Sequence, residues 1–255
     1  MLVSAAGFAV ATAALWIAGA VGPLVPLVPL GLCVAVIAVG NFWLPSGVFG
    51  RVLLAGPPDQ RAVALTFDDG PDPKSTPQVL DVLAQHGARA TFFVIGARAA
   101  QHPDLLREIA QRGHQIENHS LHHAWRTPFL PRRWLAQELA ETQAIIRRAT
   151  GRTPTWFRPP IGILSPPVAA AAAQLGLRLC GWSGKSRDGL ASTRLSDALG
   201  RLRRALRPGA ILLLHDASER GTHPPLAPTL LAQLLPELHL RGLAAVTLDE
   251  LLRDG

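Results

Sequence analysis

The chain has 255 residues, a formal net charge of +7 and two cysteines, a length typical of one large or two small domains. Residues 1–50 contain no Lys, Arg, Asp or Glu, so every formal charge lies from Arg51 onward. A basic surface suits acidic lipid headgroups or anionic glycans. The chain has no Tyr and no stacking or zinc-finger pattern, which argues against a nucleic-acid partner. Cys33 and Cys180 lack a CxxC partner, so no disulfide framework or thiolate zinc site is expected.

Two apolar runs, 2–21 and 24–44, occupy the N-terminus, and each is about as long as a membrane span. Pro23, Pro26 and Pro29 disfavour a helix between them and predict a tight turn. We therefore expect residues 1–50 to form a membrane anchor, a pair of transmembrane helices. The alternatives are one span with a re-entrant segment, or a cleaved signal peptide.

The signal-peptide alternative is based on Ala18-Gly19-Ala20, which is similar to a cleavage site, but a positively charged segment before it is missing. With the anchor retained, the protein would be integral to a bacterial-type plasma membrane. Arg51 and Arg61 favour a cytoplasmic domain by the positive-inside rule, yet long domains cross regardless of charge. Either face therefore remains open as the location of the domain.

Residues 51–60 are interpreted as a linker, and residues 61–255 as one domain in which strand-like and helical runs alternate. Seven such alternations predict a parallel β/α architecture, either an open sheet or a barrel. The expected strands are 62–67, 90–95, 115–118, 155–158, 178–182, 210–214 and 244–248. The expected helices are 76–86, 99–112, 132–149, 165–175, 193–206 and 226–241.

Polar side chains follow several of these strands. In parallel β/α folds, ligands gather at the carboxyl ends of the strands. The residues found at or just beyond a strand end are Asp68, Asp69, His119, Arg158, Asp188 and His215. Their shared placement predicts a single functional site.

The sequence Asp68-Asp69-Gly70-Pro71 and the histidines His119 and His123 have the composition of an open metal site. One Asp and two His can hold a divalent cation and leave a position for water, while the second Asp accepts a proton. On a helical turn, a spacing of four would place both histidines on one face. Taken alone, each motif could equally be a solvated turn or a surface cluster.

Three further residues suit supporting roles. Arg158, in Arg158-Pro159-Pro160, can fix a carboxylate and keep it ionised. His215 follows an apolar run and suits a general acid for a leaving amine. Asp188 can orient a histidine.

Together the motifs TFDDGP at 66–71, HSLHH at 119–123, RPPIG at 158–162 and LLH at 213–215 resemble those of the polysaccharide deacetylases of carbohydrate esterase family 4. The resemblance covers roughly residues 60–250 and implies a distorted (β/α)7 barrel. It implies that Asp69, His119 and His123 bind the metal, which in the family is usually Zn²⁺. The resemblance assigns Asp68 as general base, Arg158 as its positioning residue, His215 as general acid and Asp188 as the partner of His215.

The resemblance also places Leu213 in the acetyl pocket and makes Ile161 and Trp182 substrate contacts. The family usually has an aromatic residue where Ile161 stands and a Trp where Gly189 follows Asp188. Both differences remove aromatic walls of the site. The resemblance therefore specifies the type of reaction more closely than it specifies the substrate. The Ile161 backbone N–H can still stabilise an oxyanion.

We therefore expect a metal-dependent hydrolase that removes an N-acyl group from an amino sugar in a polysaccharide, acting on a linear amide. One alternative is deacylation or deformylation of a lipid-linked amino sugar. Another is a non-catalytic, membrane-anchored glycan-binding protein. The expected partners are an amino-sugar glycan or lipid-linked sugar and the membrane; the sequence has no signature of a particular oligomeric state.

Overall fold

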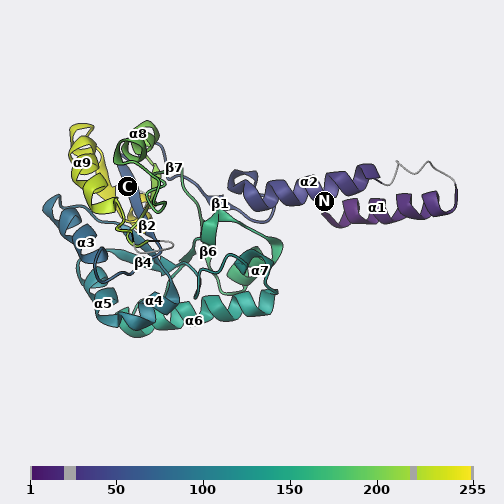
Figure 1. Ribbon diagram of the computed structural model, residues 1–255, viewed down its shortest axis with the longest axis horizontal. Coiled ribbons are helices and arrows are strands. Elements are labelled where there is room, and N and C mark those ends of the chain that lie inside the picture. Colours follow the sequence, from purple (N-terminus) through teal and green to yellow (C-terminus); the bar gives the residue numbers. More distant parts are fainter. Residues whose placement is uncertain (1, 20–26, 219–222, 254–255) are drawn as a thin grey trace.

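The computed structural model describes residues 2–19, 27–218 and 223–253. Figure 1 shows a curled sheet surrounded by helices, with two helices projecting to one side. The projecting helices are α1 (Leu2–Ile17) and α2 (Leu27–Phe42), which lie alongside each other. We refer to α1 and α2 together as the helical arm.

Among the described residues, no helix has the length and apolar character that crossing a membrane requires. The expected pair of transmembrane helices is therefore not supported. The turn expected at Pro23 and Pro26 falls outside the described residues. Pro29 does not prevent a helix, because it lies in the first turn of α2, where its missing N–H leaves no hydrogen bond unmade.

All the paired strands of the nine-stranded sheet run parallel, in the order β1-β6-β5-β4-β3-β2-β8-β7, with β9 also paired to β2. The sheet curls into a distorted α/β barrel, as expected, but it has nine strands rather than seven. The two strands not expected are β1 and β7, which stand at the two ends of the strand order. The strands are β1 (Val52–Leu53), β2 (Ala62–Asp68), β3 (Thr91–Val94), β4 (Gln115–Asn118), β5 (Trp156–Phe157), β6 (Arg178–Cys180), β7 (Gly184–Lys185), β8 (Ile211–His215) and β9 (Ala244–Val246).

The helices follow the expected positions with two differences. The helix expected at 99–112 is divided at His102, because Pro103 begins a new helix. The last expected strand ends at Val246, and Thr247 caps a short helix through a capping box with Glu250. The remaining helices are α3 (Thr76–Gln85), α4 (Gly96–Gln101), α5 (Pro103–Gln111), α6 (Arg132–Thr150), α7 (Pro166–Gln174), α8 (Leu195–Ala205), α9 (Ala227–Leu240) and α10 (Leu248–Leu251).

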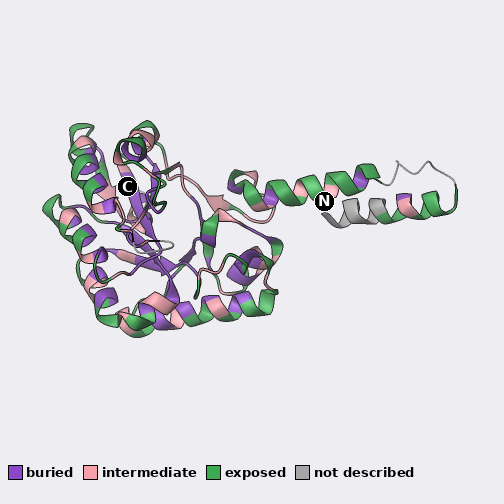
Figure 2. Cartoon of the chain, in the orientation of Figure 1, coloured by how far each residue is buried: buried purple, intermediate pink, exposed green. Residues whose placement is uncertain are grey.

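Side-chain alternation on β2 and β8 separates the core from the site. Leu65 and Phe67 point outward into the main apolar cluster beneath the helices. Asp68 lies on the opposite face of β2 and pairs in register with His215 of β8. Leu213 shares the inner face with His215, and both line a pocket. Figure 2 shows these central strands as buried.

The helical arm joins the barrel beside the short 3-10 helix η3 (Pro160–Gly162). The backbone carbonyl of Asn41 accepts a hydrogen bond from the Leu164 N–H (3.1 Å). Leu44, in the 3-10 helix η1 (Leu44–Ser46), is buried in an apolar cluster with residues of α6 and α7. The base of the arm is thus fixed to the part of the chain that follows Arg158.

Candidate active site

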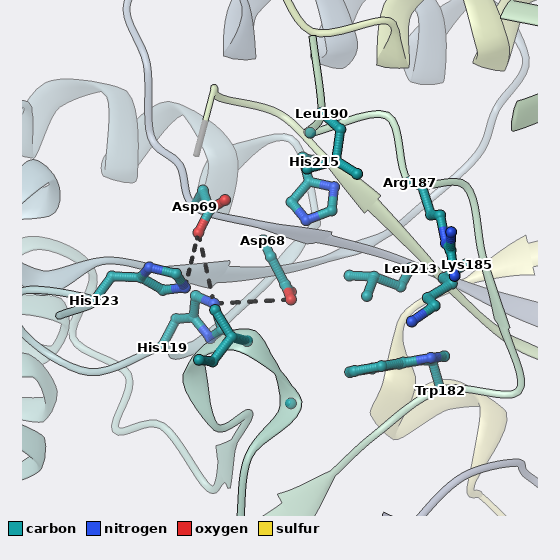
Figure 3. A pocket seen from close by; sticks show the side chains of 13 residues that line it. Asp68, Asp69, His119, His123, Trp182, Lys185, Arg187, Leu190, Leu213 and His215 are labelled. Carbon is teal, nitrogen blue, oxygen red and sulfur yellow. Dashed lines mark ion pairs between the residues drawn. The ribbon is translucent and has the colours of Figure 1, made fainter. Parts of the chain in front are cut away.

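A pocket opens at the carboxyl ends of the strands (Figure 3). It contains most of the residues predicted from the strand ends, although they are far apart in the sequence. The lining residues are Asp68, Asp69, His119, His123, Ile161, Gly162, Trp182, Lys185, Arg187, Gly189, Leu190, Leu213 and His215.

One side of the pocket is a divalent metal site formed by Asp69, His119 and His123. Their possible ligand atoms all lie within 4.8 Å of one another. The Asp69 Oδ1 atom is 3.6 Å from His119 Nε2 and 3.4 Å from His123 Nε2. One carboxylate and two imidazoles are a donor set that suits a divalent transition metal.

The backbone around the site brings these donors together through left-handed residues. Asp69 follows the last residue of β2 with φ 75°, which turns its side chain away from the strand alternation. Residues 119–123 form a loop, so the helical turn expected for the two histidines is wrong. Ser120 (φ 67°) and His123 (φ 51°) turn this loop, and the Ser120 hydroxyl accepts a hydrogen bond from the His123 N–H (3.1 Å).

His119 has the protonation state that a metal ligand requires. Burial lowers its pKa to about 3, with the nearby charges of Arg158 and His215 acting in the same direction, so the ring is neutral at physiological pH. Its Nδ1 lies 2.7 Å from the backbone carbonyl of Arg158, so Nδ1–H donates to that oxygen. The Nε2 lone pair is therefore left for a cation, the usual arrangement of a metal-bound histidine.

Asp68 lies next to the metal donors but is held by Arg158. The guanidinium is fully buried and donates from Nη1 to Asp68 Oδ1 (2.7 Å) and to Thr66 Oγ1 (2.8 Å). Its Nη2 donates to the Gly181 carbonyl (2.8 Å). The second oxygen of Asp68, Oδ2, lies 3.8 Å from His119 Nε2, on the side of the metal donors. Arg158 thus fixes one oxygen and leaves the other facing the pocket.

His215 lines the same pocket as the metal donors (Figure 3). Its imidazole is paired with Asp188. The His215 Nδ1 is 2.8 Å from Asp188 Oδ1, and the His215 backbone N–H donates to Asp188 Oδ2 (3.1 Å). Burial alone would lower the pKa of His215. The hydrogen bond to Asp188 and the negative charges of Asp188, Asp69 and Asp68 outweigh burial and raise the pKa of His215 to about 9. The ring is thus a proton donor near neutral pH.

The three predicted substrate contacts, Ile161, Trp182 and Leu213, also line the pocket. Ile161 has φ 51°, an uncommon backbone conformation for a β-branched residue. Gly162 lets the chain pass close to Trp182, because a Cβ there would lie 2.6 Å from the indole.

Three lining residues were missed by the sequence reasoning: Lys185, Arg187 and Leu190. They lie close to Asp188 in the sequence, on the segment that follows β6. This position beyond a strand end is the signal that could have identified them.

The chain has close relatives among characterised proteins. The family model described as polysaccharide deacetylase matches residues 55–180. A peptidoglycan-N-acetylglucosamine deacetylase of Bacillus cereus is 34% identical over 80% of this chain and 94% of its own length. A chitooligosaccharide deacetylase of Bradyrhizobium sp. is 37% identical over 75% of this chain and 90% of its own length.

Solved structures give the same result. A family 4 acetyl xylan esterase from Clostridium thermocellum, in complex with a cobalt ion, aligns with a TM-score of 0.68 and 34% identity over 74% of this chain and 89% of that one. A family 4 pseudoenzyme from Bacillus anthracis aligns with a TM-score of 0.72 and 25% identity over 80% of this chain and 69% of that one. From the identity to the curated relatives, the fold and the metal site, the chain belongs to the polysaccharide deacetylase family, carbohydrate esterase family 4.

Proposed function

We propose that the protein is a metal-dependent hydrolase that removes an N-acetyl group from an amino sugar of a polysaccharide such as peptidoglycan or a chitooligosaccharide. The observation that carries this proposal is that one pocket holds the three metal donors together with the Arg158-paired carboxylate of Asp68 and the Asp188-paired imidazole of His215. The curated relatives support the substrate class, because their names specify N-acetylglucosamine in peptidoglycan and chitooligosaccharide.

Asp69, His119 and His123 would hold the cation, for which we propose Zn²⁺. The neutral, oriented His119 and the mixed donor set of nitrogen and carboxylate oxygen suit zinc. The chemistry supplied by such a cation is polarisation of an amide carbonyl and acidification of water.

Asp68 acts as the general base. Its Oδ1 is occupied by Arg158, so Oδ2 accepts the proton of the attacking water. Arg158 keeps this carboxylate in one orientation throughout the reaction. The backbone N–H of Ile161 is proposed to donate to the oxyanion that forms on the amide carbonyl.

His215 acts as the general acid. Asp188 holds its Nδ1 side, so the opposite nitrogen, Nε2, carries the proton that is given to the departing amine. Leu213, on the same strand face, would contact the methyl of the acetyl group, and Trp182 would contact the sugar. The products are acetate and a free amino sugar, and no covalent intermediate with the protein is required.

The test is direct. The full-length protein, loaded with zinc, is incubated with a neutral chitooligosaccharide and with peptidoglycan fragments, and acetate release and product mass are measured. We expect each deacetylation to lower the mass of the glycan by one acetyl group. Absence of release from every N-acetylated glycan, with metal bound, would favour the non-catalytic glycan-binding alternative.

We also propose that the helical arm attaches the protein to a membrane. Support comes from its large apolar side chains exposed to solvent, among them Leu27, Val28, Leu32, Val34 and Phe42, and from the absence of charge in residues 1–50. Because the arm joins the barrel beside η3, which contributes Ile161 to the pocket, a membrane-linked amino sugar is the second candidate substrate. The proposed location is a bacterial-type plasma membrane.

Flotation with lipid vesicles tests the attachment. We expect the full-length protein to float with the vesicles, and the double variant Leu32→Asp and Val34→Asp to remain at the bottom. Leu240→Asp is the matched control, because Leu240 is an exposed apolar residue at the end of α9, away from the arm. Equal flotation of both variants would contradict the proposal.

A further inference from the structure

The wall of the pocket opposite the metal donors has two cations, Lys185 and Arg187 (Figure 3). Both are exposed toward solvent and line the pocket. Lys185 is the last residue of β7 and pairs in register with Leu213 of β8. Since residues opposite each other on parallel strands point to the same face, Lys185 points to the pocket side as Leu213 does. Its position is therefore set by the sheet.

The segment that carries the two cations is well held. Ser186, between them, is buried, and its backbone N–H donates to the Leu213 carbonyl (3.0 Å). The Ser186 hydroxyl bonds the Asp188 carboxylate, and the Ser186 carbonyl accepts from Arg201 (3.2 Å). Arg187 has φ 65°, a conformation that is costly for a residue with a side chain and is often found at functional sites.

Within residues 2–19, 27–218 and 223–253, no carboxylate forms an ion pair with Lys185 or Arg187. The pocket carboxylates are committed elsewhere: Asp68 to Arg158, and Asp69 to the metal donors. Burial, and then the charge of Arg187, lower the pKa of Lys185, which is the effect of a like charge nearby.

We propose that Lys185 and Arg187 bind an oxyanion group, a carboxylate or a phosphate, on the substrate next to the acetylated sugar. This inference rests on the proposed deacetylase function and specifies its substrate as an anionic glycan. An ammonium and a guanidinium side by side suit a group with several acceptor oxygens. Trp182 lies at the edge of the same wall, with the Lys185 ammonium 5.5 Å from its ring centre, and provides an apolar face for the sugar ring.

The test compares three substrates of similar size: a neutral chitotetraose, a peptidoglycan tetrasaccharide with lactyl carboxylates, and a chitooligosaccharide ending in a phosphate. The double variant Lys185→Gln and Arg187→Gln is measured against Arg207→Gln. Arg207 is an exposed cation just before β8, at the end of the barrel opposite the pocket, so its loss changes charge without changing the site.

We expect the wild-type protein to prefer one of the anionic substrates and the double variant to lose that preference through a rise in KM of about tenfold or more, with kcat little affected. The preference should also weaken as salt is added, because part of the interaction is exposed. The substrate that shows the larger loss identifies the group as carboxylate or phosphate. Arg207→Gln should keep the wild-type preference.

An unchanged ratio of anionic to neutral kcat/KM in the double variant would overturn the inference while leaving the deacetylase function intact. If no substrate is turned over, the deacetylase function itself fails. The inference is then decided by calorimetric titration of the phosphate-ended oligosaccharide: weaker binding to the double variant than to wild type supports it, and equal binding overturns it.

Discussion

Two buried carboxylates at the top of the barrel, Asp68 and Asp188, differ in their partners and so in the chemistry that they support. Asp68 is paired with Arg158, which does not release a proton, and its second oxygen faces the metal donors. Asp188 is paired with His215, which can release one. We therefore propose that the same side-chain type acts as a base at Asp68 and supports an acid at Asp188, according to its neighbour.

The largest expected effect comes from replacing Asp68, the proposed general base. Asp68→Asn keeps the shape of the side chain but removes its capacity to accept a proton, so kcat should fall by at least about a hundredfold. Metal content should stay at the wild-type level, because Asp68 is not among the three clustered donors. Steady-state acetate release together with elemental analysis measures both quantities. Activity near wild type in this variant would show that another group takes the proton.

The second prediction concerns Asp188. Asp188→Asn removes the charge that raises the pKa of His215, so His215 should lose its proton at lower pH. We expect kcat to fall by about tenfold and the alkaline limb of the pH–rate profile to move to lower pH. In the wild-type enzyme this limb should lie below the metal-free value of about 9, since a bound dication disfavours the imidazolium. If the alkaline limb of the Asp188→Asn variant stays at the wild-type pH, the proposed role of Asp188 in raising the pKa of His215 is contradicted.

The same pair predicts a pH dependence of stability in the metal-free protein. Because the pKa of His215 in the folded protein is raised above its ordinary value, the pairing with Asp188 contributes fully to the free energy of unfolding below about pH 6.5. That contribution is lost as the pH rises through about 9. Denaturant unfolding should show that the free energy of unfolding of the wild-type protein decreases from pH 6 to pH 10. The decrease should be smaller in Asp188→Asn. Equal decreases would contradict this prediction.

The smallest expected effect is steric. A Cβ on Gly189 would lie 3.1 Å from His215 Cγ, so Gly189→Ala should displace the imidazole slightly and reduce kcat by a few-fold, with metal content unchanged. Gly200→Ala in α8 is a control for the cost of replacing a glycine, since its backbone is not left-handed and a Cβ there meets only Arg204 Nη1, at an ordinary contact distance of 3.6 Å. A reduction in kcat of equal size in both variants would show that the contact with His215 is irrelevant.

The sequence allowed much of this arrangement to be predicted, because strand alternation determines which side chains share a face. Asp68 and His215 could be placed together from the ends of two apolar strands. The approach of His119 and His123 could not be derived correctly, because it depends on left-handed residues in a loop rather than on helical spacing. The strands β1 and β7 are two residues each, too short for a periodic signal, and Lys185 was missed with β7.

The central claim is that Asp69, His119 and His123 hold one divalent cation, and metal analysis of two neighbouring histidine variants tests it most directly. His122 is an exposed histidine paired with Glu138 (3.1 Å), three residues from the buried His119. We predict one zinc per chain in wild type and in His122→Ala. In His119→Ala, both the bound zinc and the acetate-releasing activity should be lost. Retention of zinc by His119→Ala, or an equal loss in both variants, would contradict the account.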